Sequence, residues 1–338
     1  MKKIIYVRNL PIGNGDITIQ SMTNTCTYDI ESTKNQILAL KNAGADLVRV
    51  SVPDDESAKA IKEFTNLGIP IIGDCHFGHK PALLAIENGI DKIRINPTNM
   101  TKEGVREVVL LAKQYNVPIR VGVNRGAVKQ TNPTAKDLAN IAYDTAKIIE
   151  DIGYDKLILA VKTSDVSQTI RAYRELNKLC DYPMHIGLTE AGTINMGIMK
   201  SAIAIGSLLN DNIGDTIRVS LAGDPVQEIY TAKKILRCAG VDKNFVNVIA
   251  CPTCARTNIA VNDIATELEK RTSNITFPLK VAVMGCVVNG IGESRDADFG
   301  VAGGKEISTI FAKGKQIKQV KNDKILDELM SLVEEYTK

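Results

Sequence analysis

Three cysteines near the C-terminal end of the chain are spaced as ligands of a metal centre. Cys251 and Cys254 form a Cys-Pro-Thr-Cys turn, and Cys286 follows in a glycine-rich loop. Structural zinc takes four cysteine or histidine ligands, but residues 244–338 contain no fourth cysteine and no histidine. Three thiolates with one remaining position suit a [4Fe-4S] cluster whose last iron takes an oxygen ligand or lies open to substrate. Glu293 is the nearest carboxylate in that loop.

Two other interpretations of these cysteines stay open. A zinc site could be completed by a cysteine from elsewhere in the chain, such as Cys238. Alternatively, Cys251 and Cys254 could be a reactive thiol pair. The chain has seven cysteines, an odd number that favours thiols or metal ligands over a disulfide framework.

A second group of polar residues alternates with the apolar residues of the predicted strands. If the Ile, Val and Leu side chains face surrounding helices, the residues between them face the opposite side of each strand. The cations on that inner face are Arg49, Arg94, Arg120, Lys162 and Arg218. The other polar residues on it include Asp74, Asn124, His185 and Ser220.

Five cations in one partly dry cavity repel one another unless an anion compensates them. A diphosphate carries several negative charges and matches the two-pronged guanidinium group, so we expect a diphosphate ligand. The alternative is that each arginine pairs with a structural carboxylate, as buried arginines usually do. The matching parity on five strands favours the diphosphate.

Two carboxylates are candidate general acids or bases. Asp74 lies on the inner face of a predicted strand, and Glu190 follows the seventh strand in Leu-Thr-Glu-Ala-Gly. Helix capping is an equally good interpretation of Glu190 from its position alone.

The elements that must position these residues alternate between strand and helix eight times. The strands are expected to begin near Ile17, Asp46, Pro70, Lys92, Pro118, Lys156, Met184 and Thr216. Eight such units in about 225 residues fit an α/β protein with a (β/α)8 TIM barrel, whose active sites lie at the C-terminal ends of the strands. A hairpin before Ile17, turning at residues 13–16, is expected to close the opposite end.

After Val241 the pattern changes to a small α+β module. We expect a strand at 246–250, a helix at about 258–271, strands near Lys280, Ile307 and Gln316, and a final helix from Asp323. The predicted domains are therefore a substrate-binding TIM barrel at 1–243 and an α+β iron-sulfur domain at 244–338.

Composition excludes several classes of protein. Of 338 residues, 44% are hydrophobic and 24% charged, which excludes disorder, and no apolar run reaches the roughly 20 residues of a membrane span. Arg8 and Pro11 interrupt any signal peptide, which predicts a cytoplasmic protein. A net charge of +3, no tryptophan and 4% aromatic residues argue against nucleic-acid binding.

Over nearly its whole length the sequence resembles bacterial 4-hydroxy-3-methylbut-2-enyl diphosphate synthases. The matching motifs are QSMTNT at Gln20, DCHF at Asp74, RINP at Arg94, VGVN at Val121, VKTSDV at Val161, HIGLTEAG at His185, TIRVSLAGDPV at Thr216, CPTCAR at Cys251 and GCVVNGIGES at Gly285. The resemblance implies reductive ring opening of 2-C-methyl-D-erythritol 2,4-cyclodiphosphate with loss of water. It also implies flavodoxin or ferredoxin as electron donor.

The resemblance also assigns roles to residues. It implies a [4Fe-4S] cluster on Cys251, Cys254, Cys286 and Glu293. Glu190, Asp74 and Glu293 are the expected catalytic residues. The substrate contacts expected from it are Arg49, Arg94, Arg120, Asn124, Lys162, His185, Arg218, Ser220 and Asn289.

The family resemblance further implies a homodimer in which each cluster domain covers the partner's barrel. Chain direction supports this arrangement, because barrel helices return the chain to the end opposite the site. From there, residues 240–249 span at most about 33 Å.

Two competing functions remain. One is an aldolase or pterin-type synthase acting on a phosphorylated substrate, with zinc in the small module. The other is a nucleic-acid binder that uses the cysteines as a zinc knuckle. Metal analysis separates the iron-sulfur enzyme from both.

Overall fold

The β-branched runs of the first two thirds of the chain form a closed ring of parallel strands. The computed structural model describes residues 2–75, 78–96, 100–128, 130–288 and 295–338. The chain divides into two units, Met1–Val241 and Asp242–Lys338, each of which is described by itself. In the described part of the chain no helix is both long and apolar enough to cross a membrane.

The first unit is a TIM barrel, as predicted. Its eight strands lie in the order β8-β7-β6-β5-β4-β3-β10-β9, every neighbouring pair is parallel, and a bridge between Leu159 and Met184 connects β8 to β9. The strands are β3 (Thr18–Met22), β4 (Leu47–Ser51), β5 (Ile71–Cys75), β6 (Lys92–Ile95), β7 (Ile119–Asn124), β8 (Leu157–Lys162), β9 (His185–Ile186) and β10 (Thr216–Ile217).

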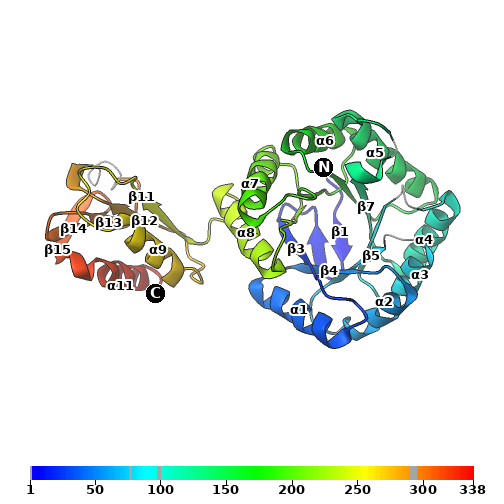
Figure 1. Ribbon diagram of the computed structural model, residues 1–338, viewed down its shortest axis with the longest axis horizontal. Helices are drawn as coiled ribbons and strands as arrows, with labels where there is room; N and C mark the ends of the chain where they lie inside the picture. Colours follow the sequence, from blue (N-terminus) through cyan, green and yellow to red (C-terminus); the bar gives the residue numbers. More distant parts are fainter. Residues whose placement is uncertain (1, 76–77, 97–99, 129, 289–294) are drawn as a thin grey trace. The chain divides into compact units, whose positions relative to one another are not determined.

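Helices surround this ring of strands (Figure 1). They are α1 (Ile30–Ala43), α2 (Asp55–Ala60), α3 (Lys80–Glu87), α4 (Lys102–Tyr115), α5 (Ala135–Asp151), α6 (Val166–Leu179), α7 (Ile194–Asn210) and α8 (Pro225–Cys238). The start of α8 follows from its sequence, because Asp224 accepts a hydrogen bond from the Val226 N–H at 2.9 Å and proline occupies the first turn.

The last two strands are shorter than expected. Arg218 and Ser220 therefore follow β10 instead of lying within it. The backbones are crowded at this point, because a Cβ on Gly187 would lie 2.3 Å from the Arg218 carbonyl oxygen. Gly187 leaves strand geometry directly after β9, with a φ of +147° that favours glycine.

The parity expected for the strands is present in the barrel. Outward-facing residues such as Val48, Ile93 and Val121 are fully buried in the large core between strands and helices. That core fixes the direction of the intervening residues, which point into the barrel.

The N-terminal hairpin differs from the prediction. β1 (Ile5–Val7) pairs with β2 (Leu10–Ile12), so the chain turns at Arg8 and Asn9, with Arg8 at a φ of +52°. Residues 13–16 instead connect β2 to β3. Ile5, Val7 and Ile12 pack against Leu47, Ile72 and Ile158 of the barrel strands, and this apolar cluster is called the floor.

The second unit is an α+β module with a five-stranded sheet in the order β11-β12-β13-β14-β15. Its elements are β11 (Val246–Ala250), α9 (Val261–Arg271), β12 (Leu279–Met284), β13 (Phe299–Ala302), β14 (Ile307–Ala312), β15 (Lys315–Lys321) and α11 (Ile325–Tyr336). β11, β12 and β13 are parallel, and the other two pairings are antiparallel. The sequence did not predict β13, which is short and contains Gly300.

Candidate functional site

The barrel strands bring the predicted cations to one interior face. In the strand register Arg94 lies opposite both Asp74 on β5 and Arg120 on β7, while Lys162 lies opposite Asn124. Arg94, Arg120 and Lys162 are only 4%, 2% and 7% exposed. A group of charged side chains therefore lies inside the barrel, largely removed from water.

Asp74 is the acidic partner of two of these cations. Its carboxylate accepts a hydrogen bond from Arg94 Nη1 at 3.0 Å and lies 3.7 Å from Arg49 Nε. Burial alone would raise the pKa of Asp74, but the guanidinium groups of Arg49 and Arg94 outweigh it and hold this pKa below its usual range. Asp74 is therefore ionised at neutral pH.

Two donors of Arg49 point at a poor acceptor. Its Nε and Nη2 lie 3.0 and 2.8 Å from the thioether sulfur of Met22. Burial, with additional repulsion from Arg218 and Arg94, lowers the pKa of Arg49 to about 9. Because thioether sulfur is a weak acceptor, an anionic oxygen would be a much better partner for these donors.

Arg120, Lys162 and His185 make no ion pair with a carboxylate in the part of the chain that the structure describes. Among the residues that the structure describes, Arg120 Nε and both ring nitrogens of His185 are buried and have no hydrogen-bond partner. Burial lowers the pKa of all three groups, and the neighbouring cations lower each pKa further. The charged forms of these groups are therefore disfavoured in the empty barrel, and an anion bound beside them would stabilise those forms.

Arg218 has a structural carboxylate that sequence reasoning missed. Glu228 on α8 is 4% exposed, lies 3.6 Å from Arg218 Nε, and accepts hydrogen bonds from Ser21 Oγ at 3.2 Å and the Leu221 N–H at 3.0 Å. An acidic residue on the apolar face of the predicted α8 helix was the available signal. The carboxylate alternative thus holds for part of the cation group only.

Lys92 is a second residue that sequence reasoning missed. It is fully buried on β6, and its Nζ has no hydrogen-bond partner among the described residues. Burial, reinforced by Arg120 and Arg49, lowers its pKa to about 7. The signal was the parity of Lys92, which is that of Arg94 two residues later.

Glu190 lies on an exposed loop after β9. The Thr189 N–H donates to the Thr163 carbonyl oxygen at 3.2 Å, so this loop lies beside the loop that follows β8. Glu190 has a φ of +53°, in the left-handed region that non-glycine residues rarely adopt. The N-cap of α7 is Thr193, so Glu190 does not occupy the capping position.

The loops that carry the three cysteines lie against each other in the second unit. Cys251 follows β11, and its Sγ accepts a hydrogen bond from the Gly285 N–H at 3.1 Å. The Asn258 N–H donates to the Gly285 carbonyl oxygen at 2.8 Å. Cys286 is therefore adjacent in sequence to a residue that contacts the Cys251 loop.

The sulfur atoms of the three cysteines are the type of donor that a thiolate-bound metal group requires. A hydrogen bond from the backbone of Arg256, aided by its positive charge, lowers the pKa of Cys254 and favours the thiolate. All seven cysteines are free thiols. Among the described residues, however, no three His, Cys, Asp or Glu side chains are arranged to hold a metal ion. The expected residues Glu293 and Asn289 lie outside the described residues.

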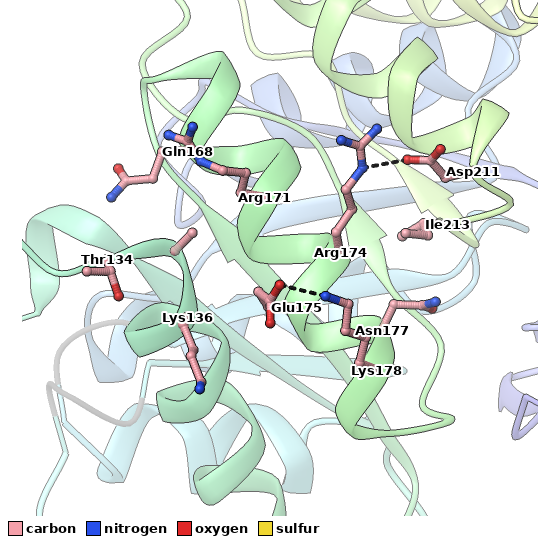
Figure 2. A pocket seen from close by; sticks show the side chains of 11 residues that line it. Thr134, Lys136, Gln168, Arg171, Arg174, Glu175, Asn177, Lys178, Asp211 and Ile213 are labelled. Carbon is pink, nitrogen blue, oxygen red and sulfur yellow. Dashed lines mark hydrogen bonds and ion pairs between the residues drawn. The ribbon is translucent and has the colours of Figure 1, made fainter.

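An open groove of about 840 Å³ on the outer wall of the barrel contains none of the predicted site residues (Figure 2). It runs along α5 and α6 to the end of α7. Arg174 Nε pairs with Asp211 at 2.7 Å, and Lys178 Nζ pairs with Glu175 at 2.8 Å. Two of its cations are thus paired with carboxylates, and none of the predicted site residues lies there, so we place the candidate site inside the barrel.

Comparisons with known proteins cover both units. Residues 2–233 match the GcpE TIM-barrel domain model, and residues 247–335 match the GcpE protein C-terminal domain model. A protein of Caldanaerobacter subterraneus subsp. tengcongensis named 4-hydroxy-3-methylbut-2-en-1-yl diphosphate synthase (flavodoxin) is 48% identical over 96% of this chain and 94% of its own. A Thermotoga maritima protein of the same name is 46% identical over 97% and 96%.

Similar solved structures cover about 70% of this chain. Dihydropteroate synthase of Yersinia pestis matches with a TM-score of 0.53 and 12% identity, covering 71% of this chain and 100% of that protein. The Stenotrophomonas maltophilia enzyme matches with a TM-score of 0.53 and 15% identity, over 69% and 97%. At such low identity the likeness supports the fold and carries no function.

Proposed function

Because this chain belongs to the GcpE family, we propose that it is the oxidoreductase that converts 2-C-methyl-D-erythritol 2,4-cyclodiphosphate to 4-hydroxy-3-methylbut-2-enyl diphosphate. Relatives at 48% and 46% identity are named as synthases of this product. The reaction belongs to the methylerythritol phosphate route to isoprenoids. Counted for the protonated acids, it takes up two electrons and two protons, opens the ring and releases one water.

The observation that carries this proposal is the uncompensated charge inside the barrel. Arg120 and Lys162 are nearly fully buried without a carboxylate partner in the described part of the chain, and Arg49 directs two donors at a thioether. Buried cations of this kind need an anion, and the two phosphates of the substrate supply it. Arg94 and Arg218, with Asn124, His185, Ser220 and Asn289, complete the set of proposed substrate contacts.

The proposed roles of the acidic residues differ. Asp74 stays ionised between Arg49 and Arg94, so it fixes the direction of both guanidinium groups and is a poor proton donor. Glu190 is exposed on a loop at the C-terminal ends of the strands and can exchange protons with solvent. We therefore assign the proton that leaves with the hydroxyl to Glu190.

A [4Fe-4S] cluster held by Cys251, Cys254, Cys286 and Glu293 is the proposed cofactor. When bound, it supplies the substrate with electrons one at a time. The backbone of Arg256 donates to Cys254 and favours its thiolate, and the Gly285 N–H donates to the sulfur of Cys251. The sulfur donors and the missing fourth cysteine fit this cluster better than a closed zinc site.

The proposed electron donor is flavodoxin or ferredoxin, and the proposed location is the cytoplasm, with neither a membrane nor a nucleic acid as partner. We also propose a homodimer in which each cluster domain covers the partner's barrel. α8 ends at Cys238, and β11 begins at Val246. The residues between them span at most about 25 Å, and α8 alone is roughly 21 Å long. A cluster domain that covered the mouth of its own barrel would therefore use nearly all of this connecting segment.

Metal analysis tests the cofactor and separates the competing functions. Protein purified without oxygen is expected to contain iron and acid-labile sulfide and to be brown. Cys286→Ser should lose both, whereas Cys180→Ser, a control cysteine in the barrel unit, should keep them. Zinc without iron or sulfide would instead support a redox-inactive barrel enzyme.

A further inference from the structure

Lys92 lies on the inner face of the barrel, and its buried Nζ has no hydrogen-bond acceptor among the described residues. It is two residues before Arg94 on β6, so both side chains point into the barrel. Its register partner on β5 is Ile72, which belongs to the apolar floor. Lys92 therefore lies nearer the floor than Arg94, and Arg49 on β4 has the same register partner, Ile72.

In the described part of the barrel, the surroundings of Lys92 contain cations and apolar groups but no free carboxylate. Arg49 on β4 and Arg120 on β7 repel its positive charge, and Lys92 in turn lowers the pKa of His185 on β9. The other charged groups facing the interior are Asp74 on β5, Arg94 on β6, Lys162 on β8, and Arg218 after β10 with Glu228 from α8.

Neither nearby carboxylate is free to pair with Lys92. Asp74 is engaged by Arg49 and Arg94, while Glu228 contacts Arg218 and Ser21. The buried Gln20 side chain also has no partner among the described residues, and it carries no charge. In the empty barrel a proton on Lys92 is thus opposed by burial and by repulsion, and its pKa falls to about 7.

We infer that Lys92 is the proton-linked part of the substrate site: it takes up a proton when the cyclic diphosphate binds, and its restored charge strengthens that binding. The inference rests on the proposed function, because it requires a diphosphate among the arginines. A negatively charged ligand beside Arg49 and Arg120 cancels the repulsion that disfavours the ammonium form of Lys92. Affinity should then decrease as the pH rises above the value at which the empty barrel releases this proton.

The cyclic diphosphate is a suitable probe, because each phosphorus carries one strongly acidic oxygen and the ligand does not itself titrate near pH 8. Calorimetry in HEPES and in Tris at pH 8 gives the number of protons exchanged on binding. Three proteins are compared: wild type, Lys92→Met and Lys113→Met. Methionine has a length similar to that of lysine but no charge, and Lys113 is an exposed control residue on α4. Thermal unfolding checks that each variant is folded.

Wild type and Lys113→Met should take up about one proton more than Lys92→Met. Above pH 7, the association constants of wild type and Lys113→Met should fall by up to about tenfold per pH unit more than the association constant of Lys92→Met. His185 and Lys162 are present in all three proteins, so the difference between the proteins measures the net effect of Lys92 on proton uptake, including its effect on His185. Equal proton uptake in Lys92→Met and wild type would overturn the role of Lys92 alone. Absence of binding in all three would overturn the proposed function as well.

Discussion

Asp74 and Arg94 face each other at matching positions of neighbouring strands, with Oδ1 and Nη1 3.0 Å apart. The same carboxylate lies 3.7 Å from Arg49. One anion thus serves two cations, and the site as a whole keeps an excess of positive charge. This imbalance favours diphosphate binding and determines how the barrel should respond to mutation.

Asp74→Asn should destabilise the empty protein at neutral pH by about 3 to 5 kcal/mol, because it leaves two buried guanidinium groups without their anion. The pKa of Asp74 is lowered in the folded state, so its stabilisation is present above the unfolded pKa of 3.8 and is lost as the pH falls through the lower folded value. Urea unfolding measures both effects. The exposed Asp55→Asn is the control, and equal stability of the two variants at pH 7 would contradict the pairing.

Lys92→Met should stabilise the empty protein. The pKa of Lys92 falls from 10.5 to about 7 on folding, so the charged form is penalised in the folded state. The cost is fully present below pH 7 and disappears as the pH rises through 10.5. Urea unfolding at pH 6.5, 8 and 9.5 should show a gain of several kcal/mol that shrinks with pH. A variant that is less stable at every pH would show that Lys92 has a buried partner.

Arg120→Leu should weaken binding of the cyclic diphosphate by about 1.5 to 3 kcal/mol, or roughly 10- to 150-fold, because it removes a charge-assisted contact. The stability of the empty protein should hold or rise, since the substitution also relieves repulsion with Arg49 and Arg94. Calorimetry and thermal unfolding measure the two quantities. Unchanged affinity combined with lower stability would mean that Arg120 has only a structural role.

A shared active site can be tested by mixing two inactive chains, Cys254→Ser and Lys162→Ala, under conditions that allow subunits to exchange. If each cluster domain serves the partner's barrel, a heterodimer regains one site with an intact barrel and an intact cluster. About half of the wild-type activity per heterodimer is expected. A verified heterodimer without activity, or full activity in a strictly monomeric wild type, would exclude this arrangement.

Sequence periodicity predicted the barrel well because its strands are buried runs of β-branched residues. Each predicted start lies within one residue of the observed strand. Parity then placed Arg49, Arg94 and Arg120 on the inner face. The same parity would have found Lys92, had it been applied to the first residue of its strand.

Other features depend on contacts that periodicity does not contain. Glu228 approaches Arg218 from a helix, so strand parity could not reveal it. The Gly-Asn-Gly-Asp segment at 13–16 gave a stronger turn signal than Arg8 and Asn9, where the hairpin turns. The arrangement of Cys251, Cys254 and Cys286 depends on loops, and their function as ligands stays a prediction.

We propose that the barrel holds the cyclic diphosphate while the cysteine module delivers electrons to it. The most direct measurement is a single turnover without oxygen: protein with its iron and sulfide verified is mixed with 2-C-methyl-D-erythritol 2,4-cyclodiphosphate and reduced flavodoxin, and the products are identified by mass spectrometry. We expect 4-hydroxy-3-methylbut-2-enyl diphosphate at about one equivalent per site, with none from Cys254→Ser. Substrate bound to the reduced, cluster-loaded protein and recovered unchanged would contradict the account.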